Sequence, residues 1–231
     1  MTFKEKQDAI LNDFSATSTD SFITLTIVKS YINRQERRIA GLYPWPHTKT
    51  AEVRDSEVNQ EYYNYPEDWV QDSIYRLEFN NEKHDPTDFD DYEQYKKENN
   101  ASEKRFANFE NKYFINPTPS SAIVGGISIW GHKLPANMVN DADLSPFAED
   151  PEIEEEIINL TRAALMQKQR GSYLTAGLNL EKDTLAKITA IWKKTYMKKA
   201  KFMTRSRSMF NPIDILGQPS SRSLGNRPGN F

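Results

Sequence analysis

Residues 43–79 read YPWPHTKTAEVRDSEVNQEYYNYPEDWVQDSIYRLEF, and the spacing of apolar residues changes within this stretch. Before Tyr43 and after about Pro151, apolar residues recur every three or four positions, which is the spacing of one face of a helix. Between these points they alternate or form short runs bounded by Pro, Gly and Asn, which is typical of strands and loops. The sequence therefore predicts an α+β protein, in which a helical bundle is interrupted by a β-rich insertion and followed by an extended C-terminal arm.

This change of period divides the chain into four parts. We expect residues 1–45 and 147–205 to form the two parts of the helical bundle, residues 46–146 to form the β-rich insertion, and residues 206–231 to form an extended docking arm. The expected helices are residues 3–14, 21–42, 151–170 and 180–204, with Thr19 or Asp20 capping the second.

The helix of residues 21–42 has one apolar stripe, which contains Leu25, Val28, Ile32, Gln35, Ile39 and Leu42. Its other face would carry Arg34, Glu36, Arg37 and Arg38. Tyr43-Pro-Trp-Pro46 ends the helix, because proline disfavours helical geometry in the preceding residue and has no N–H. In the helix of residues 151–170, several glutamates favour the start, and the last helix should bury Leu185, Ile188, Trp192 and Tyr196.

Within the insertion we expect short strands and one helix. The predicted strands are residues 55–58, 60–63, 74–79, 105–109 and 112–115. Gly125-Gly126 predicts a two-residue hairpin between residues 123–124 and 127–130, because glycine tolerates the positive φ of such turns. Thr87 can cap an acidic helix over residues 88–97.

Composition narrows the class of protein. The chain contains no cysteine, which excludes disulfides, iron–sulfur clusters and thiolate catalysis. No apolar run reaches the length of about 20 residues that spans a bilayer. The charge is polarised: residues 52–110 contain 17 acidic and 7 basic side chains, whereas residues 182–207 contain 9 basic side chains and Asp183 as the one acid. Such polarity suits a protein whose two ends meet different partners.

No catalytic, cofactor or metal constellation emerges from the motifs. His47, His84 and His132 lie far apart without metal-ligand spacing, and His47 and His132 are interpreted as loop or turn histidines. The acidic run from Asp85 lacks the glycine and the final carboxylate of a calcium loop, because Asp90 and Lys96 stand at those positions. We therefore expect no enzyme activity, no cofactor and no metal.

Two segments are candidates for binding a partner. The basic last helix could contact DNA or an acidic protein surface, although lysines around Trp192 and Tyr196 also suit the solvated face of a bundle helix. In the polar tail we expect an apolar cluster to anchor the arm on a partner; its members are Phe210, Pro212, Ile213, Ile215 and Leu216.

The order of these signals resembles a known family. The signals run from Ile39-Ala-Gly-Leu-Tyr-Pro-Trp-Pro46 through Gln60–Pro66, Pro86–Tyr92, Tyr113–Pro117 and Ile129–Gly131 to Met209-Phe210-Asn-Pro212. This pattern, over about residues 18–216, is similar to the head-to-tail adaptor (connector) proteins of tailed bacteriophages, including the tail-tube gatekeepers of short-tailed phages.

The resemblance implies a structural protein of the virion neck, assembled in the host cytoplasm. It implies a homo-oligomeric ring, a dodecamer, that is fixed beneath the portal protein, contacts tail or nozzle proteins and surrounds the path of double-stranded DNA. It implies neither catalysis nor a membrane. The alternatives are a nucleic-acid-binding module that uses the basic last helix, and another tail component.

Overall fold

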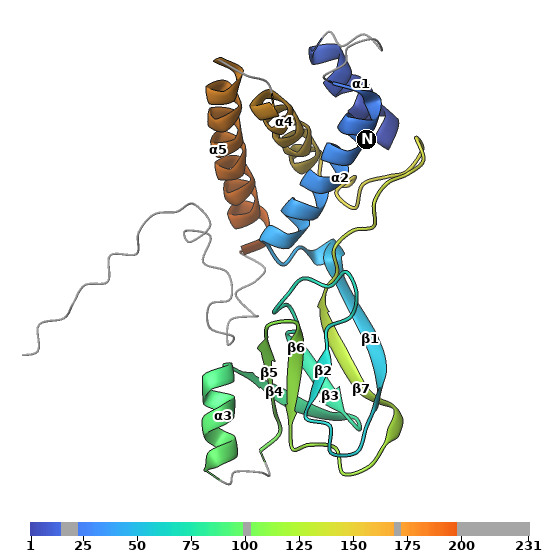
Figure 1. Cartoon of the computed structure of the whole chain (residues 1–231), viewed down its shortest axis with the longest axis vertical. Coiled ribbons are helices and arrows are strands. Elements are labelled where there is room, and N and C mark those ends of the chain that lie inside the picture. Colours follow the sequence, from blue (N-terminus) through green and yellow to red (C-terminus); the bar gives the residue numbers. More distant parts are fainter. Residues whose placement is uncertain (15–22, 99–102, 169–171, 198–231) are drawn as a thin grey trace, which may run out of the picture.

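The computed structural model describes residues 1–14, 23–98, 103–168 and 172–197, and it confirms the expected α+β architecture. Helices from both ends of this part of the chain form one half of the molecule, and a curled sheet from the middle of the chain forms the other (Figure 1). The five predicted anchors of the arm, from Phe210 to Leu216, lie outside the described residues.

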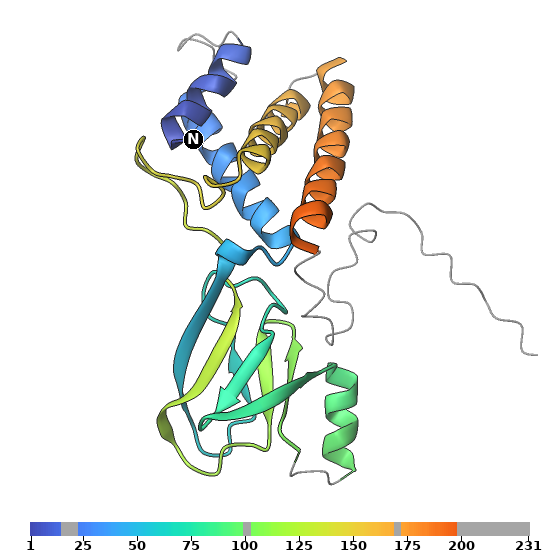
Figure 2. The ribbon, with the colours of Figure 1, turned by 180° about the vertical axis from the view of Figure 1, so that it is seen from behind.

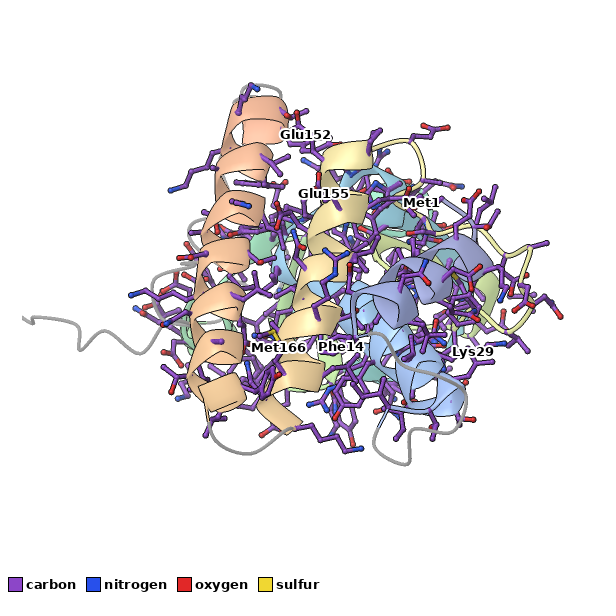
Figure 3. The ribbon with its side chains drawn as sticks, turned by 90° about the horizontal axis from the view of Figure 1, so that it is seen from above. Met1, Phe14, Lys29, Glu152, Glu155 and Met166 are labelled. Carbon is purple, nitrogen blue, oxygen red and sulfur yellow. The ribbon has the colours of Figure 1, made fainter. Side chains whose placement is uncertain are left out.

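The helical half contains α1 (Phe3–Asp13), α2 (Leu25–Leu42), α4 (Pro151–Lys168) and α5 (Ser172–Trp192), and a π-helical turn, η2 (Lys193–Met197), follows α5. Thr2 and Glu5 form a capping box at the start of α1. Thr24 caps α2, so the described helix begins four residues after the expected start, and the predicted caps Thr19 and Asp20 lie outside the described residues. Seen from above, α4 lies between α5 and the pair α1 and α2 (Figure 3).

The other half is a seven-stranded sheet with the strand order β1-β7-β3-β4-β5-β6-β2. Neighbouring strands are antiparallel except for β4 and β5. The sheet curls until its edge strands meet, since the Arg54 guanidinium of β1 donates a hydrogen bond to the Asn64 carbonyl of β2 at 2.6 Å. The strands are β1 (Lys49–Ser56), β2 (Tyr62–Asn64), β3 (Arg76–Phe79), β4 (Glu82–Thr87), β5 (Arg105–Phe109), β6 (Lys112–Asn116) and β7 (Ile123–His132).

The curled sheet encloses an aromatic and aliphatic core. Buried side chains from five of its strands and from the loop after β2 fill it, including Tyr63, Trp69, Leu77, Phe106 and Ile129. The acidic helix α3 (Phe89–Lys97) covers one side, where Phe89 stacks on Phe109 with ring centroids 4.3 Å apart.

Gly125-Gly126 does not form the predicted hairpin. β7 continues through both glycines as one strand of 10 residues, and the pairing of β1 with β7 shifts register between Arg54 and Ser56, opposite this point. Gly125 has a φ of +66°, so the conformational freedom that favours a turn serves a bulge in a continuous strand. The expected strand over residues 55–58 is also wrong, because β1 ends at Ser56 and Val58 lies in the loop that follows.

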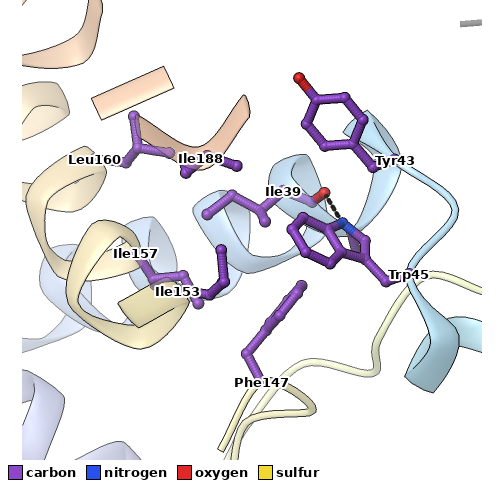
Figure 4. Close-up of a cluster of buried hydrophobic side chains, with 9 residues drawn as sticks. Ile39, Tyr43, Trp45, Phe147, Ile153, Ile157, Leu160 and Ile188 are labelled. Atoms are coloured by element: carbon purple, nitrogen blue, oxygen red, sulfur yellow. Dashed lines mark hydrogen bonds between the residues drawn. The ribbon is translucent and has the colours of Figure 1, made fainter. Parts of the chain in front are cut away.

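The two halves meet around Trp45, which is fully buried (Figure 4). Its indole Nε1 donates a hydrogen bond to the carbonyl oxygen of Ile39 at 2.7 Å, near the end of α2. Phe147 packs edge-on against the indole, with ring centroids 5.5 Å apart. The Tyr43-Pro-Trp-Pro46 segment therefore both ends α2 and inserts a side chain beneath it. The next residues form a 3₁₀ turn, η1 (Pro46–Thr48), that leads directly into β1 (Figure 2).

A buried charge cluster holds α1 against α2 and α4. The Lys6 ammonium is fully buried, 2.7 Å from the Glu36 carboxylate and 3.1 Å from that of Glu154, and the amine of Met1 also pairs with Glu154. The expectation that Glu36 lies on the solvated face of α2 is therefore wrong, because its partner comes from another helix. Leu25 is 44% exposed, so the apolar stripe of α2 begins at Val28.

Candidate functional site

Of the three histidines, His47 is exposed in η1, as expected of a loop or turn histidine, and the other two are buried in the sheet. His84 on β4 and His132 at the end of β7 are buried, so the interpretation of His132 as a loop histidine is wrong. His132 Nδ1 lies 2.8 Å from the hydroxyl of Thr48, and burial, with a smaller effect of Lys49, lowers the pKa of His132 to about 4. The imidazole is therefore neutral near pH 7 and fixes η1 to the sheet. Across the described ranges, no group of three or more His, Asp or Glu side chains could hold a metal ion.

No helix in the described part of the chain combines the length and the apolar composition that a bilayer crossing requires.

Helix α5 has one packed side and one open side. This helix packs against α4 through Gly177, Thr184 and Ile188, which are its buried residues. A Cβ atom on Gly177 would lie 2.8 Å from the carbonyl oxygen of Ala163, so glycine allows the two helices to approach closely here. The opposite side of α5 is open.

Large apolar side chains are exposed on the first turns of α5. Tyr173, Leu174 and Leu178 are 53%, 46% and 52% exposed. Scattered exposed apolar residues are ordinary, but three within two turns of one thinly covered helix mark a surface that a partner can cover. The sequence prediction missed them, because it began this helix at Leu180, eight residues after its observed start.

A groove lies beside this face, between α2, α4 and α5. It has a volume of about 470 Å³, and its charged lining consists of Arg34, Arg38, Lys168 and Glu181. The guanidinium of Arg38 pairs with Glu181 at 2.7 Å, whereas Arg34 and Lys168 are exposed and pair with no carboxylate in the described residues. We call this the basic groove.

A second hollow lies where the start of α4 meets the end of α5. It has a volume of about 400 Å³ and is lined by Glu152, Glu155, Glu156, Lys187 and Lys194, together with Ala190 and Ile191. Lys187 lies 3.4 Å from Glu156, which is mostly buried, whereas Glu152 and Glu155 are exposed on successive turns of α4 (Figure 3). We call this surface the acidic flank.

The far end of the sheet carries two more surfaces. Asp88, Asp90 and Asp91 are exposed around the start of α3. The helix is fixed by Tyr92, whose buried hydroxyl donates to the carbonyl of Ile115 at 3.1 Å. Val53, Val58 and Val124 are exposed apolar residues near the bulge of β7, and Val124 is 91% exposed.

The basic last helix is only partly described. Lys182, Lys187, Lys193 and Lys194 are exposed, and Trp192 and Tyr196 are half-buried against the core around Trp45. Trp192 stacks on Tyr43 with ring centroids 4.7 Å apart, and Tyr196 donates a hydrogen bond to Asp150. The aromatic face thus packs as expected, and the lysines surround it instead of forming one stripe.

Comparison with known protein families gives one match. Residues 1–204 match the family described as SU10 adaptor protein. This range includes every helix and strand that the structure describes. No curated protein matches the chain.

Proposed function

The chain belongs to the SU10 adaptor protein family, a family of phage head-to-tail adaptors, and on this premise we propose that its copies form a ring, a dodecamer, that continues the DNA channel from the portal to the tail. The match confirms the adaptor family that the sequence predicted. Membership implies a structural role in the virion, contact with other virion components, and no enzyme activity.

The observation that supports a ring is the open side of α5. A helix that packs mainly on α4 and exposes Tyr173, Leu174 and Leu178 leaves apolar area that another copy can bury. Cyclic assemblies bury such area by repeating one contact between two different surfaces of the same subunit.

The native mass of the purified protein, with and without portal protein, tests this proposal. We expect a closed ring in stoichiometric complex with the portal. A protein that stays monomeric in the presence of portal, or that binds duplex DNA instead with a steep salt dependence, would refute it. The second result would favour the nucleic-acid-binding alternative.

Attachment to the portal is the proposed role of the C-terminal arm. Phe210, Pro212, Ile213, Ile215 and Leu216 form an apolar cluster in a polar segment, which is the composition of a docking peptide. Deleting residues 206–231 should leave the circular dichroism spectrum unchanged and abolish portal binding. Loss of folding in the truncated chain would contradict this role, since it would make the segment part of the core.

The acidic start of α3 is proposed to face the DNA path in the neck, where like charge keeps DNA from adhering to the channel wall. Asp88, Asp90 and Asp91 are all exposed there. Replacing all three by asparagine should slow DNA ejection from single virions. Unchanged ejection would place these side chains elsewhere.

A further inference from the structure

The two charged surfaces beside α5 lie on opposite sides of its contact with α4. The buried residue Thr184 marks the contact line. At about 100° per residue, Glu181 of the basic groove falls about 60° to one side of Thr184, and Lys187 and Ala190 of the acidic flank fall about 60° and 120° to the other. The pair α4 and α5 therefore separates a surface of positive charge from a surface of negative charge.

The basic groove has unused positive charge. Of its three cations, Arg38 is paired with Glu181, which leaves Arg34 on α2 and Lys168 at the end of α4. The acidic flank has unused negative charge, because Lys187 offsets Glu156 and leaves Glu152 and Glu155 facing solvent with Lys194 as the remaining cation. Like charges gathered this way favour a partner surface of the opposite sign.

We propose that the basic groove of one copy receives the acidic flank of the next copy, with Arg34 and Lys168 facing Glu152 and Glu155 across the contact. This inference rests on the proposed ring and names the surfaces that close it. A ring needs two different surfaces on opposite sides of one subunit, and these two satisfy that requirement with complementary charge. The same contact covers Leu174 and Leu178, which lie with Glu181 on the groove side of α5.

The test is a charge swap between copies. One variant carries Arg34→Glu with Lys168→Glu, and a second carries Glu152→Lys with Glu155→Lys. All four side chains are exposed, and the swap spares Arg38 and its pair with Glu181. Each variant alone places like charges across the contact, so we expect its ring yield on portal protein to fall about tenfold or more. Circular dichroism and melting temperature confirm that each variant is folded.

Mixing the two variants in equal amounts should restore the ring. In the mixture, an acidic groove of the first variant faces a basic flank of the second, and the unaltered basic groove of the second faces the unaltered acidic flank of the first. The restored ring should alternate the two variants, which native mass spectrometry can count. A variant with Lys97→Glu and Lys133→Glu is the matched control, since both lysines are exposed and line neither surface, and it should form rings as the unaltered chain does.

The outcomes separate the two proposals. Rings formed by either variant alone, or no recovery in the mixture, would overturn this contact while the unaltered ring stands. No ring from the unaltered chain on portal protein would overturn the proposed function as well. Rings that form from the unaltered chain and from the mixture, but from neither variant by itself, support both the proposed ring and the proposed contact.

Discussion

Lys6 is the residue whose removal should destabilise the fold most among the charged side chains of the helical half. Its ammonium is fully buried, and it neutralises Glu36 and Glu154, whose side chains are 1% and 4% exposed. In Lys6→Met the aliphatic stem is kept and the charge is lost, so two buried carboxylates retain the Met1 amine as their one nearby cation among the described residues. Breaking a buried ion pair from one side costs about 3–5 kcal/mol, out of a total stability of about 5–15 kcal/mol for an ordinary domain.

Urea unfolding followed by circular dichroism measures this loss. With a dependence of about 2 kcal/mol per M, the midpoint should fall by about 2 M. Adding Glu36→Gln and Glu154→Gln to Lys6→Met should recover much of the loss, because neutral amides in the same place carry no uncompensated charge. The matched control is Lys4→Met, which removes an exposed ion pair with Asp8 on the same helix and should leave the midpoint unchanged. A Lys6→Met midpoint equal to that of Lys4→Met would refute the reasoning.

Three further changes test other parts of the fold. Burial lowers the pKa of His132 from 6.5 to about 4, so the unfolded chain binds a proton at this residue more readily than the folded chain does. The free energy of unfolding should therefore be highest above pH 6.5 and fall by about 3 kcal/mol as the pH is lowered to 4. In His132→Gln this pH dependence of thermal unfolding should flatten. Gly131→Ala places a Cβ atom 2.5 Å from the Trp69 ring, so it should destabilise the sheet by about 1–3 kcal/mol and shift Trp fluorescence, and an unchanged melting temperature would contradict the close packing. Trp45→Phe keeps an aromatic ring but leaves the Ile39 carbonyl without its indole donor, which should cost about 1–3 kcal/mol in urea unfolding, whereas Trp130→Phe, on a partly exposed ring, should cost less.

Local pattern was sufficient to predict the architecture. The change in apolar spacing at Tyr43 and again near Pro151 coincides with the end of α2 and the start of α4. The order of signals also identified the adaptor family, which the match over residues 1–204 confirms. Both predictions succeed because they depend on the spacing of apolar residues and on the positions of Pro and Gly, which can be read directly from neighbouring residues in the sequence.

Features that depend on residues far apart in the sequence could not be predicted from local patterns. Glu36 has the polarity of a solvated residue, and nothing near it in sequence indicates that Lys6, thirty positions away, lies beside it. Gly125 has the same local signal in a hairpin and in a bulge, and only its pairing with β1, about seventy residues earlier, distinguishes them. The start of α5 was missed because Leu174 and Leu178 point away from the core, so no buried stripe marks that turn.

The path of the chain between the halves has a mechanical consequence. Both ends of the described chain lie in the helical half, and the sheet half is reached through two crossings, at the starting end of β1 and the finishing end of β7 (Figure 2). These strands are hydrogen-bonded neighbours, paired from Lys49 with His132 onward. A force that pulls the sheet half away from the helices is therefore carried by the backbones of two neighbouring strands, β1 and β7. Both strands are pulled in the same direction, so the hydrogen bonds between them are not sheared. Tension applied at the sheet half thus reaches the helices through the backbone, while the β1–β7 ladder stays in register.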